Sequence, residues 1–217
     1  MMRKKYKAVI FDLDGTLLDT LKDLQEGTNY ALRVNGMPER TLDEIRRFVG
    51  SGARKLIERV IPGHEKEGVF EKVMEDFNFY YKEHCKDHTQ PYPGIAELLH
   101  ELKQNGYALG VVSNKPDFAV QELIPDYFPD TFASVTGERK GVAKKPAPDL
   151  IWEAVKKLNV AKDEAVYVGD SEVDLEAANN AGLPCISVAW GFKGREFLER
   201  HNAAIIVESP EEIMQHV

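Results

Sequence analysis

From residue 91 onward, short apolar runs alternate with amphipathic stretches. The apolar runs, rich in Val, Ile and Ala, are 107–113, 132–135, 165–169, 185–190 and 203–207. Between them, apolar residues recur with helical spacing over 94–106, 116–128, 148–159 and 174–182. Strands that alternate with helices of this length predict a parallel sheet covered by helices on both faces. The run at 7–12 has the same character and is expected to join that sheet, which gives a Rossmann-like α/β fold.

The segment from 20 to 89 has a different pattern. Helical spacing covers 21–36, 41–50, 53–61 and 65–88, and we find no convincing strand among these residues. Short helices connected in this way usually form a bundle. The aromatic residues at 77–81 are expected to pack inside it. We therefore expect two units, a core formed by 1–19 and 90–217 and an inserted all-helical domain formed by 20–89.

Composition and charge narrow the classes of partner. The chain has 217 residues and a formal net charge of −8. This acidic balance argues against nucleic acid and anionic membranes as partners, because both need a basic surface. Cys85 and Cys185 lie far apart in the sequence, which fits a reducing compartment, and no apolar run approaches the roughly 18 residues of a membrane span. We expect a cytoplasmic protein, and the sequence leaves its oligomeric state open.

Polar side chains follow the predicted strands at the points where these strands end. They are Asp12, Asp14 and Thr16 after the first run, Ser113 and Asn114 after the second, Lys145 beyond the third, and Asp170 and Asp174 after the fourth. In an open parallel sheet, ligands bind beyond the carboxyl ends of the strands. We therefore expect these side chains to meet at one edge of the sheet.

Such a set of acids, hydroxyls and a lysine suits metal-assisted chemistry on a phosphate. Asp12 and Asp170 can supply the hard oxygen ligands that Mg²⁺ prefers. A carboxylate can attack phosphorus once a metal and a lysine offset the charge of the phosphate. The second carboxylate, Asp14, can protonate the leaving oxygen and later activate water. Ser113 and Asn114 offer hydrogen-bond donors to the phosphoryl oxygens.

This constellation resembles the haloacid dehalogenase-like hydrolase superfamily over nearly the whole chain. The resemblance rests on D-L-D-G-T at 12–16, on Ser113, on Lys145 before a proline, and on G-D-S-E-V-D at 169–174. It implies Asp12 as the nucleophile and Asp14 as the general acid and base. Four motifs in the expected order make coincidence negligible.

The same resemblance implies how the remaining residues act. Mg²⁺ would be held by Asp12, Asp170 and the backbone carbonyl of Asp14, with Asp174 on the metal side or supporting the ligands from behind. The phosphate would be bound by Thr16, Ser113, Asn114 and Lys145. The helical insert corresponds to the cap domain of the superfamily.

Within the superfamily, the segments 48–60, 113–116 and 189–192 are most similar to phosphoglycolate phosphatases. This similarity implies hydrolysis of a small phosphorylated metabolite, 2-phosphoglycolate first, through an aspartyl phosphate. Ser51, Gly52 and Arg54 are candidates for the substrate carboxylate, because a helix N-terminus and an arginine both bind carboxylates. The alternatives are a pyrophosphatase, a nucleotide or sugar phosphatase, a β-phosphoglucomutase-like phosphomutase, and a phosphate-binding protein without catalysis.

Overall fold

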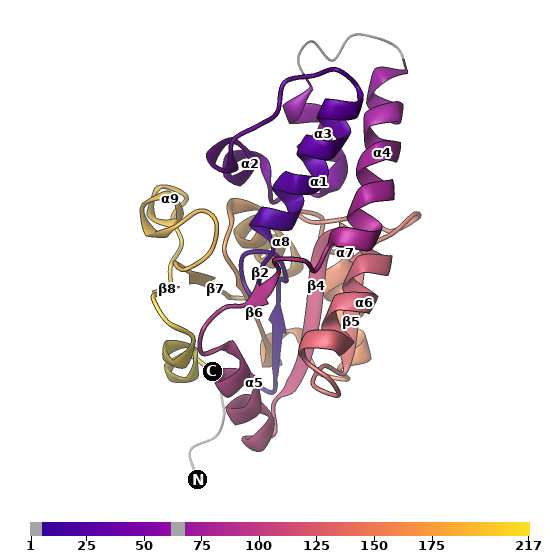
Figure 1. Ribbon diagram of the computed structural model, residues 1–217. Helices are drawn as coiled ribbons and strands as arrows, with labels where there is room; N and C mark the ends of the chain where they lie inside the picture. Colours follow the sequence, from indigo (N-terminus) through magenta and orange to yellow (C-terminus); the bar gives the residue numbers. More distant parts are fainter. Residues whose placement is uncertain (1–5, 62–67) are drawn as a thin grey trace.

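A six-stranded parallel sheet forms the centre of the molecule. The computed structural model describes residues 6–61 and 68–217 (Figure 1). The strands run in the order β5-β4-β1-β6-β7-β8, and every neighbouring pair is parallel. Their bounds are β1 Ala8–Phe11, β4 Ala108–Pro116, β5 Ser134–Glu138, β6 Ala165–Gly169, β7 Cys185–Val188 and β8 Ile206–Val207. The predicted Rossmann-like α/β fold is confirmed.

Helices cover both faces of this sheet, and β1 is therefore apolar at every position. Ala8 and Ile10 pack on one face and Val9 and Phe11 on the other, and all four are fully buried. α7 (Asp149–Lys157) and α8 (Glu172–Ala181) cover the first face, whereas α5 (Ile95–Gln104) and α6 (Asp117–Tyr127) cover the second. A strand buried on both faces needs a continuous apolar run. The end of β1 is therefore rigidly placed.

Several predicted strand boundaries differ from the structure. β5 covers Ser134–Glu138 where the predicted run is 132–135, and β8 covers only Ile206–Val207 of the run at 203–207. β4 continues to Pro116, so Ser113, Asn114 and Lys115 lie within the strand and not after it. Its pairing with β5 shifts register between Val112 and Pro116, so this final part of the strand follows an irregular path. β7 stops at Val188, two residues earlier than the apolar pattern suggests. Trp190 leaves the sheet and its indole Nε1 donates to the carbonyl oxygen of Thr16 at 3.1 Å.

Four helices lie beyond the carboxyl end of the sheet, at the top of Figure 1, and we call them the cap. They are α1 Leu21–Val34, α2 Leu42–Phe48, α3 Ala53–Val60 and α4 Val69–His84. The predicted helix over 65–88 starts among residues outside the described part, and the structure describes it from Val69. The sequence also predicts that the chain forms two units, a core of 1–19 and 90–217 and a helical domain of 20–89. That division stays a prediction.

The chain enters and leaves the cap through one short pair of strands. β2 (Leu18–Asp19) pairs antiparallel with β3 (Gln90–Pro91). Beside this ladder, the buried carboxylate of Asp23 in α1 accepts hydrogen bonds from the backbone N–H of His88 and from the N–H and hydroxyl of Thr89, at 2.7–2.9 Å. The start of the cap is thus tied to its end.

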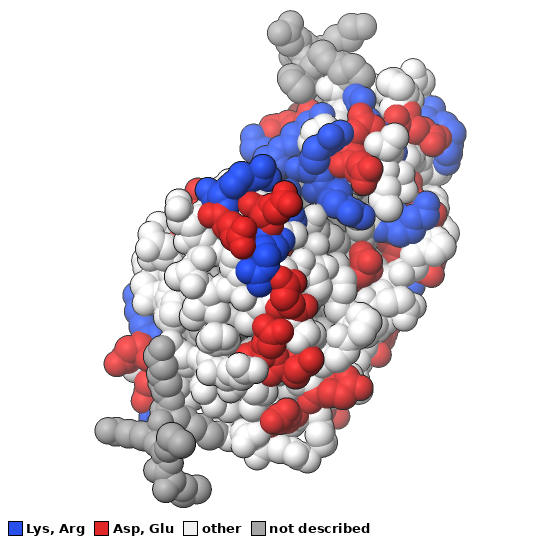
Figure 2. All heavy atoms as spheres, turned by 90° about the vertical axis from the view of Figure 1, so that its left-hand side faces the viewer, with Lys and Arg blue, Asp and Glu red and all other residues white. Residues whose placement is uncertain are grey.

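Charge is unevenly spread over the face seen in Figure 2. Lys and Arg side chains gather toward the end that carries the cap, and Asp and Glu form a band over the lower part. Arg46 and Arg47 in the last turn of α2 and Arg59 in the last turn of α3 belong to the cap. Positive charge therefore collects near the cap although the chain as a whole is acidic.

The remaining elements are α9 (Arg195–Arg200) and two short 3-10 helices. Lys162–Glu164 leads into β6, and Pro210–Gln215 follows β8 near the edge of the sheet. A helix both long and apolar enough to cross a membrane does not occur in 6–61 or 68–217.

Candidate active site

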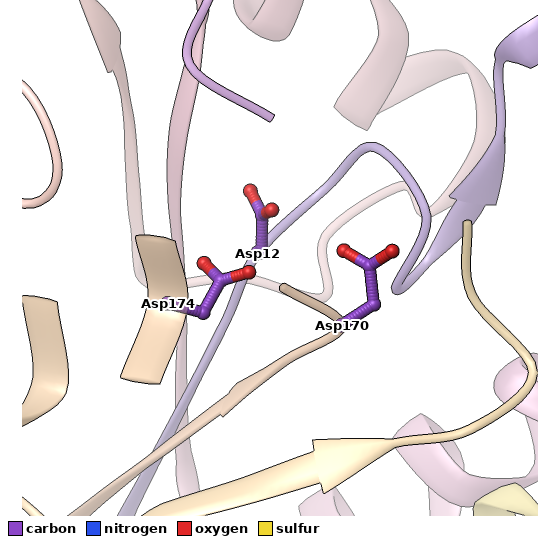
Figure 3. Close-up of side chains that lie close together, drawn as sticks. All are labelled: Asp12, Asp170 and Asp174. Atoms are coloured by element: carbon purple, nitrogen blue, oxygen red, sulfur yellow. The ribbon is translucent and has the colours of Figure 1, made fainter. Parts of the chain in front are cut away.

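Three buried aspartates meet at the carboxyl end of the sheet. Asp12 directly follows β1, Asp170 directly follows β6, and Asp174 lies in the first turn of α8 (Figure 3). One carboxylate oxygen from each lies within 4.8 Å of those of the other two. The backbone N–H of Asp12 donates to the carbonyl of Val168 in β6 at 2.8 Å, which fixes the two central strand ends together. The sheet thus brings Asp12 together with two acids, Asp170 and Asp174, that lie far from it in the sequence.

One buried cation serves these acids. The Lys145 ammonium lies 2.9 Å from Oδ1 of Asp12 and 2.7 Å from Oδ1 of Asp174, and it also donates to the Tyr167 hydroxyl at 2.9 Å. Burial raises the pKa of Asp12 to about 7, although Lys145 acts to lower it. Burial also raises the pKa of Asp170, and the charges of Asp174 and Asp12 raise it further. Three carboxylates against one ammonium leave a deficit of positive charge, which a divalent cation would fill.

The hydrogen bonds of the three acids separate their roles. Both oxygens of Asp174 are occupied, Oδ1 by Lys145 and the Tyr167 hydroxyl, and Oδ2 by the backbone N–H and hydroxyl of Ser171. Asp12 receives Lys145 and the Leu13 N–H on Oδ1 alone. Asp170 receives the Phe192 N–H on Oδ2 alone, at 2.7 Å.

Asp12 and Asp170 therefore each keep one oxygen without a hydrogen-bond partner among the residues that the structure describes. Mg²⁺ is typically held by one or two carboxylates, with waters and substrate oxygens completing its shell. The donor set fits Mg²⁺, with Asp12 and Asp170 as its carboxylate ligands. Asp174 instead holds Lys145 and Ser171 in place. Of the two positions expected for it, on the metal side or behind the ligands, these contacts favour the second.

Glycine in the first motif lets two acid-bearing loops touch. Gly15 has φ +85°, a left-handed conformation that residues with a Cβ rarely adopt. A Cβ at this position would lie 2.5 Å from Oδ2 of Asp170 and 2.9 Å from the Phe192 ring. The turn after Asp14 can therefore approach Asp170 closely only with glycine here.

Asp14 pairs with a second buried lysine. Its Oδ1 accepts from the Lys115 ammonium at 2.9 Å, and Lys115 also donates to the hydroxyl of Tyr81 in α4 at 2.6 Å. Burial alone would lower the pKa of Lys115, but the Asp14 carboxylate and the Tyr81 hydroxyl raise it above its usual value. The two acids of the first motif thus have different cations, Lys145 for Asp12 and Lys115 for Asp14.

The predicted phosphate-binding residues lie around this pair. Ser113 Oγ accepts the Lys115 N–H at 3.2 Å, which leaves its hydroxyl hydrogen for a ligand. Asn114 donates to the carbonyls of Lys145 at 2.9 Å and of Gly50 in the cap at 3.3 Å. Its Oδ1 and the hydroxyl of Thr16 are buried without a hydrogen-bond partner among the described residues. Phosphate binding by these side chains and Lys145 stays a prediction.

A small cavity of about 40 Å³ lies between the core and the cap. Asp12, Asp14 and Lys115 line it from the core. The side facing them is largely apolar and includes Leu24, Val49, Gly52, Ala53, Leu56 and Phe77. Its small volume favours a small ligand beside Asp12 and Asp14.

Of the three predicted cap residues, the structure brings only Gly52 to the lining of this cavity. Ser51 Oγ accepts from the Arg59 guanidinium at 3.4 Å. The Arg54 guanidinium lies 4.3 Å from the centre of the Phe70 ring and lines a separate open hollow with Lys82 and Arg139. A role for Arg54 in substrate binding stays a prediction without a contact to the acids.

Two residues that the structure places in the site were given no role in it from the sequence. Lys115 follows Ser113 and Asn114 at the end of the second apolar run, which was the available signal. Tyr81 was expected to pack within the cap. It does stack on the Phe77 ring, with centroids 5.0 Å apart, but its hydroxyl also contacts Lys115. Spacing alone does not distinguish a packing tyrosine from one whose hydroxyl contacts a buried lysine.

Comparison with known proteins decides the family. Residues 9–188 match the family described as haloacid dehalogenase-like hydrolase. The chain belongs to this family. The hydrolase is 32% identical to a phosphoglycolate phosphatase of Xanthomonas campestris pv. campestris, with 96% of this chain and 95% of that protein aligned. It is 31% identical to a phosphoglycolate phosphatase of Vibrio parahaemolyticus, with 100% and 98% aligned.

Solved structures agree with the hydrolase over its whole length. A crystal structure from Lactobacillus delbrueckii subsp. bulgaricus, provisionally named a phosphoglycolate phosphatase, is 39% identical, with a TM-score of 0.93 and 98% of both chains covered. A second from Haemophilus somnus is 28% identical, with a TM-score of 0.91 and the same coverage. The predicted enzyme class, a phosphoric monoester hydrolase, is confirmed by the family and these relatives.

Proposed function

We propose that this hydrolase is a Mg²⁺-dependent phosphatase that acts on 2-phosphoglycolate through an aspartyl phosphate. The observation that carries the proposal is the separate pairing of the two acids at one cavity, Asp12 with Lys145 and Asp14 with Lys115. Two carboxylates with different surroundings can perform different tasks. The names of the relatives support 2-phosphoglycolate, and the small size of the cavity favours it over nucleotides and hexose phosphates.

In the first step, a carboxylate oxygen of Asp12 attacks phosphorus, and the bond from phosphorus to the leaving oxygen breaks. Asp14 gives its proton to that oxygen, so the leaving oxygen departs as a hydroxyl group and not as an alkoxide. In the second step, Asp14 takes a proton from water, which attacks the phosphorus of the aspartyl phosphate. Orthophosphate leaves and the Asp12 carboxylate is restored.

Lys145 lies beside the attacking acid throughout and offsets the charge of the phosphoryl oxygens. Mg²⁺, when bound, would lower the repulsion between the nucleophile and the dianionic phosphate. Asp12, Asp170 and the backbone carbonyl of Asp14 would hold it. Asp174 keeps Lys145 in place through a 2.7 Å contact. The basic residues near the cap, seen in Figure 2, would favour the approach of anionic esters.

The test is phosphate release with Mg²⁺ from 2-phosphoglycolate, pyrophosphate, nucleoside monophosphates and hexose phosphates. We expect 2-phosphoglycolate to give the highest kcat/KM. Asp12→Asn should lower kcat by about 10⁴-fold or more, because the nucleophile is lost. The matched control is Asp163→Asn, an exposed acid remote from the site.

Two further outcomes test the mechanism itself. Mass spectrometry of acid-quenched enzyme should find phosphate attached to the peptide that contains Asp12. Full activity of Asp12→Asn would contradict the nucleophile assignment. Isomerisation of a hexose phosphate with little free phosphate would favour a phosphomutase instead.

We also propose a cytoplasmic location. Cys85 and Cys185 are both free thiols, Cys85 buried and Cys185 partly buried. Unpaired thiols are typical of a reducing compartment. Fractionation of the cells that make the enzyme tests the location, and recovery outside the cytoplasmic fraction would contradict it.

A further inference from the structure

Lys115 is placed differently from Lys145, although both are buried lysines beside an aspartate. Lys145 contacts the nucleophile Asp12 and the supporting acid Asp174, both on the floor of the site. Lys115 contacts Asp14, which delivers a proton to the leaving oxygen, and Tyr81 of the cap. Lys115 therefore lies on the leaving-group side of the cavity.

Lys115 is also the only Lys or Arg among the described residues that line this cavity. Its side chain is 1% exposed, so bulk water screens its charge little. An ammonium carries three N–H donors. The structure gives two of them acceptors, Asp14 Oδ1 at 2.9 Å and the Tyr81 hydroxyl at 2.6 Å. The third donor can serve an anionic group in the cavity.

The apolar part of the lining makes the third donor of Lys115 selective for a polar or charged leaving group. Leu24, Val49, Ala53, Leu56 and Phe77 offer no side-chain polar atom to a leaving group. A charged or hydroxylated leaving group that enters this space must find a partner, because an unpaired polar group in a closed apolar site is costly. Lys115 supplies one positive charge, next to the proton donor and at a fixed position.

We propose that Lys115 binds a carboxylate carried by the leaving alcohol, and so selects small phosphate esters with a carboxylate adjacent to the ester carbon. This inference rests on the proposed phosphatase function and assigns its substrate choice to a core residue. Tyr81 positions the ammonium from the cap side. Arg54, the arginine suggested by the sequence, contacts Phe70 and lines a different hollow.

The test compares two esters of similar size, 2-phosphoglycolate and ethyl phosphate, which lacks the carboxylate. We expect the wild-type enzyme to prefer 2-phosphoglycolate in kcat/KM by about 10- to 100-fold, the range of one charge-assisted hydrogen bond. In Lys115→Met this ratio should fall to near 1, whatever happens to the absolute rates. The ratio is the decisive readout, because loss of the contact to Asp14 lowers the rate for both esters alike.

Tyr81→Phe provides a second variant, since it keeps the charge of Lys115 and removes only one acceptor. It should lower the ratio by about 3- to 10-fold, through a higher KM for 2-phosphoglycolate. Thermal unfolding would reveal whether Lys115→Met is folded. If it is not, Tyr81→Phe still tests the inference. Lys156→Met, at an exposed lysine of α7, is the control and should leave the ratio at the wild-type value.

The contrary outcomes are distinct. An unchanged ratio in Lys115→Met, with both rates reduced equally, would limit Lys115 to holding Asp14 and overturn the inference. Collapse of the ratio in Arg54→Met but not in Lys115→Met would assign the carboxylate to the cap arginine. Equal use of both esters by the wild-type enzyme would overturn the inference and leave the phosphatase intact. Release of phosphate from neither ester would overturn the proposed function and the inference with it.

Discussion

The ammonium nitrogen of Lys145 lies 2.7 Å from Oδ1 of Asp174, and both side chains are 1% exposed. The pair lies beneath the nucleophile Asp12, which shares the same ammonium at 2.9 Å. A buried ion pair contributes little net stability, but removal of one partner is costly because the other charge is then unpaired. The stability of the protein should therefore fall when one partner of this pair is replaced, and fall less when both partners are replaced together.

Lys145→Met should destabilise the metal-free protein by about 3 kcal/mol or more, since two carboxylates lose their cation. Urea unfolding measures the change. The double variant Lys145→Met with Asp174→Asn should recover part of the loss, because it removes one of the uncompensated charges. Equal stability of Lys145→Met and the wild-type protein would contradict this account of the buried charges.

Asp170→Asn should have opposite effects on stability and on metal binding. The metal-free variant should unfold at a higher temperature than the wild-type protein, because one of three crowded carboxylates becomes neutral. Mg²⁺ at a hundred times its Kd should stabilise the wild-type protein by about 2.7 kcal/mol and the variant by much less. Thermal unfolding with and without Mg²⁺ measures both effects, with Asp163→Asn as the control. Equal stabilisation of the wild-type protein and Asp170→Asn by Mg²⁺ would exclude Asp170 as a ligand.

Lys193 joins the core to the cap and should affect closure. Its ammonium donates to the carbonyls of Arg46, Arg47 and Val49, at 3.2–3.4 Å, where α2 ends. A cation at a helix C-terminus is favourable. Lys193→Met should raise the KM for substrate by about 3- to 10-fold and increase amide exchange in α2, with Lys156→Met as the control. Unchanged exchange in α2 would show that this contact does not hold the cap.

Asp23→Ala should destabilise the protein without touching the site. Three donors from His88 and Thr89 would lose a buried acceptor, which costs about 2–4 kcal/mol in total. Glu26→Gln, one turn later on α1 and partly exposed, is the control and should cost less than about 1 kcal/mol. Urea unfolding measures both variants. A loss in Asp23→Ala no larger than in the control would mean that these bonds do not hold the start of the cap to its end.

The parts of the fold that depend on local pattern could be predicted from the sequence. The apolar run before Asp12 and the one before Asp170 are each buried on both faces, so each leaves an unambiguous signal. The carboxyl ends of the strands then follow from the topology. Asp12, Asp170 and Asp174 are therefore expected at one place, and the structure has them there.

The parts of the site that depend on contacts between distant segments could not be predicted from the sequence. Lys115 and Tyr81 are 34 residues apart, and nothing local to either indicates that they meet. The direction of Arg54 depends on where Phe70 lies once α3 and α4 have packed. The end of β4 is set by pairing with β5, so the apolar run alone placed it too early.

The two-residue ladder of β2 and β3 has a consequence for how such an enzyme can change. Asp19 and Gln90 are directly opposed across this antiparallel pair, as the two ends of a hairpin would be. Any segment whose ends lie one strand spacing apart can therefore be inserted between them without disturbing the order of the sheet. One continuous stretch of chain can thus be exchanged without moving the strand ends that carry the catalytic acids. Such an exchange would alter the apolar wall that faces Asp12 and Asp14, while the core residues of the site, Lys115 included, stay in place.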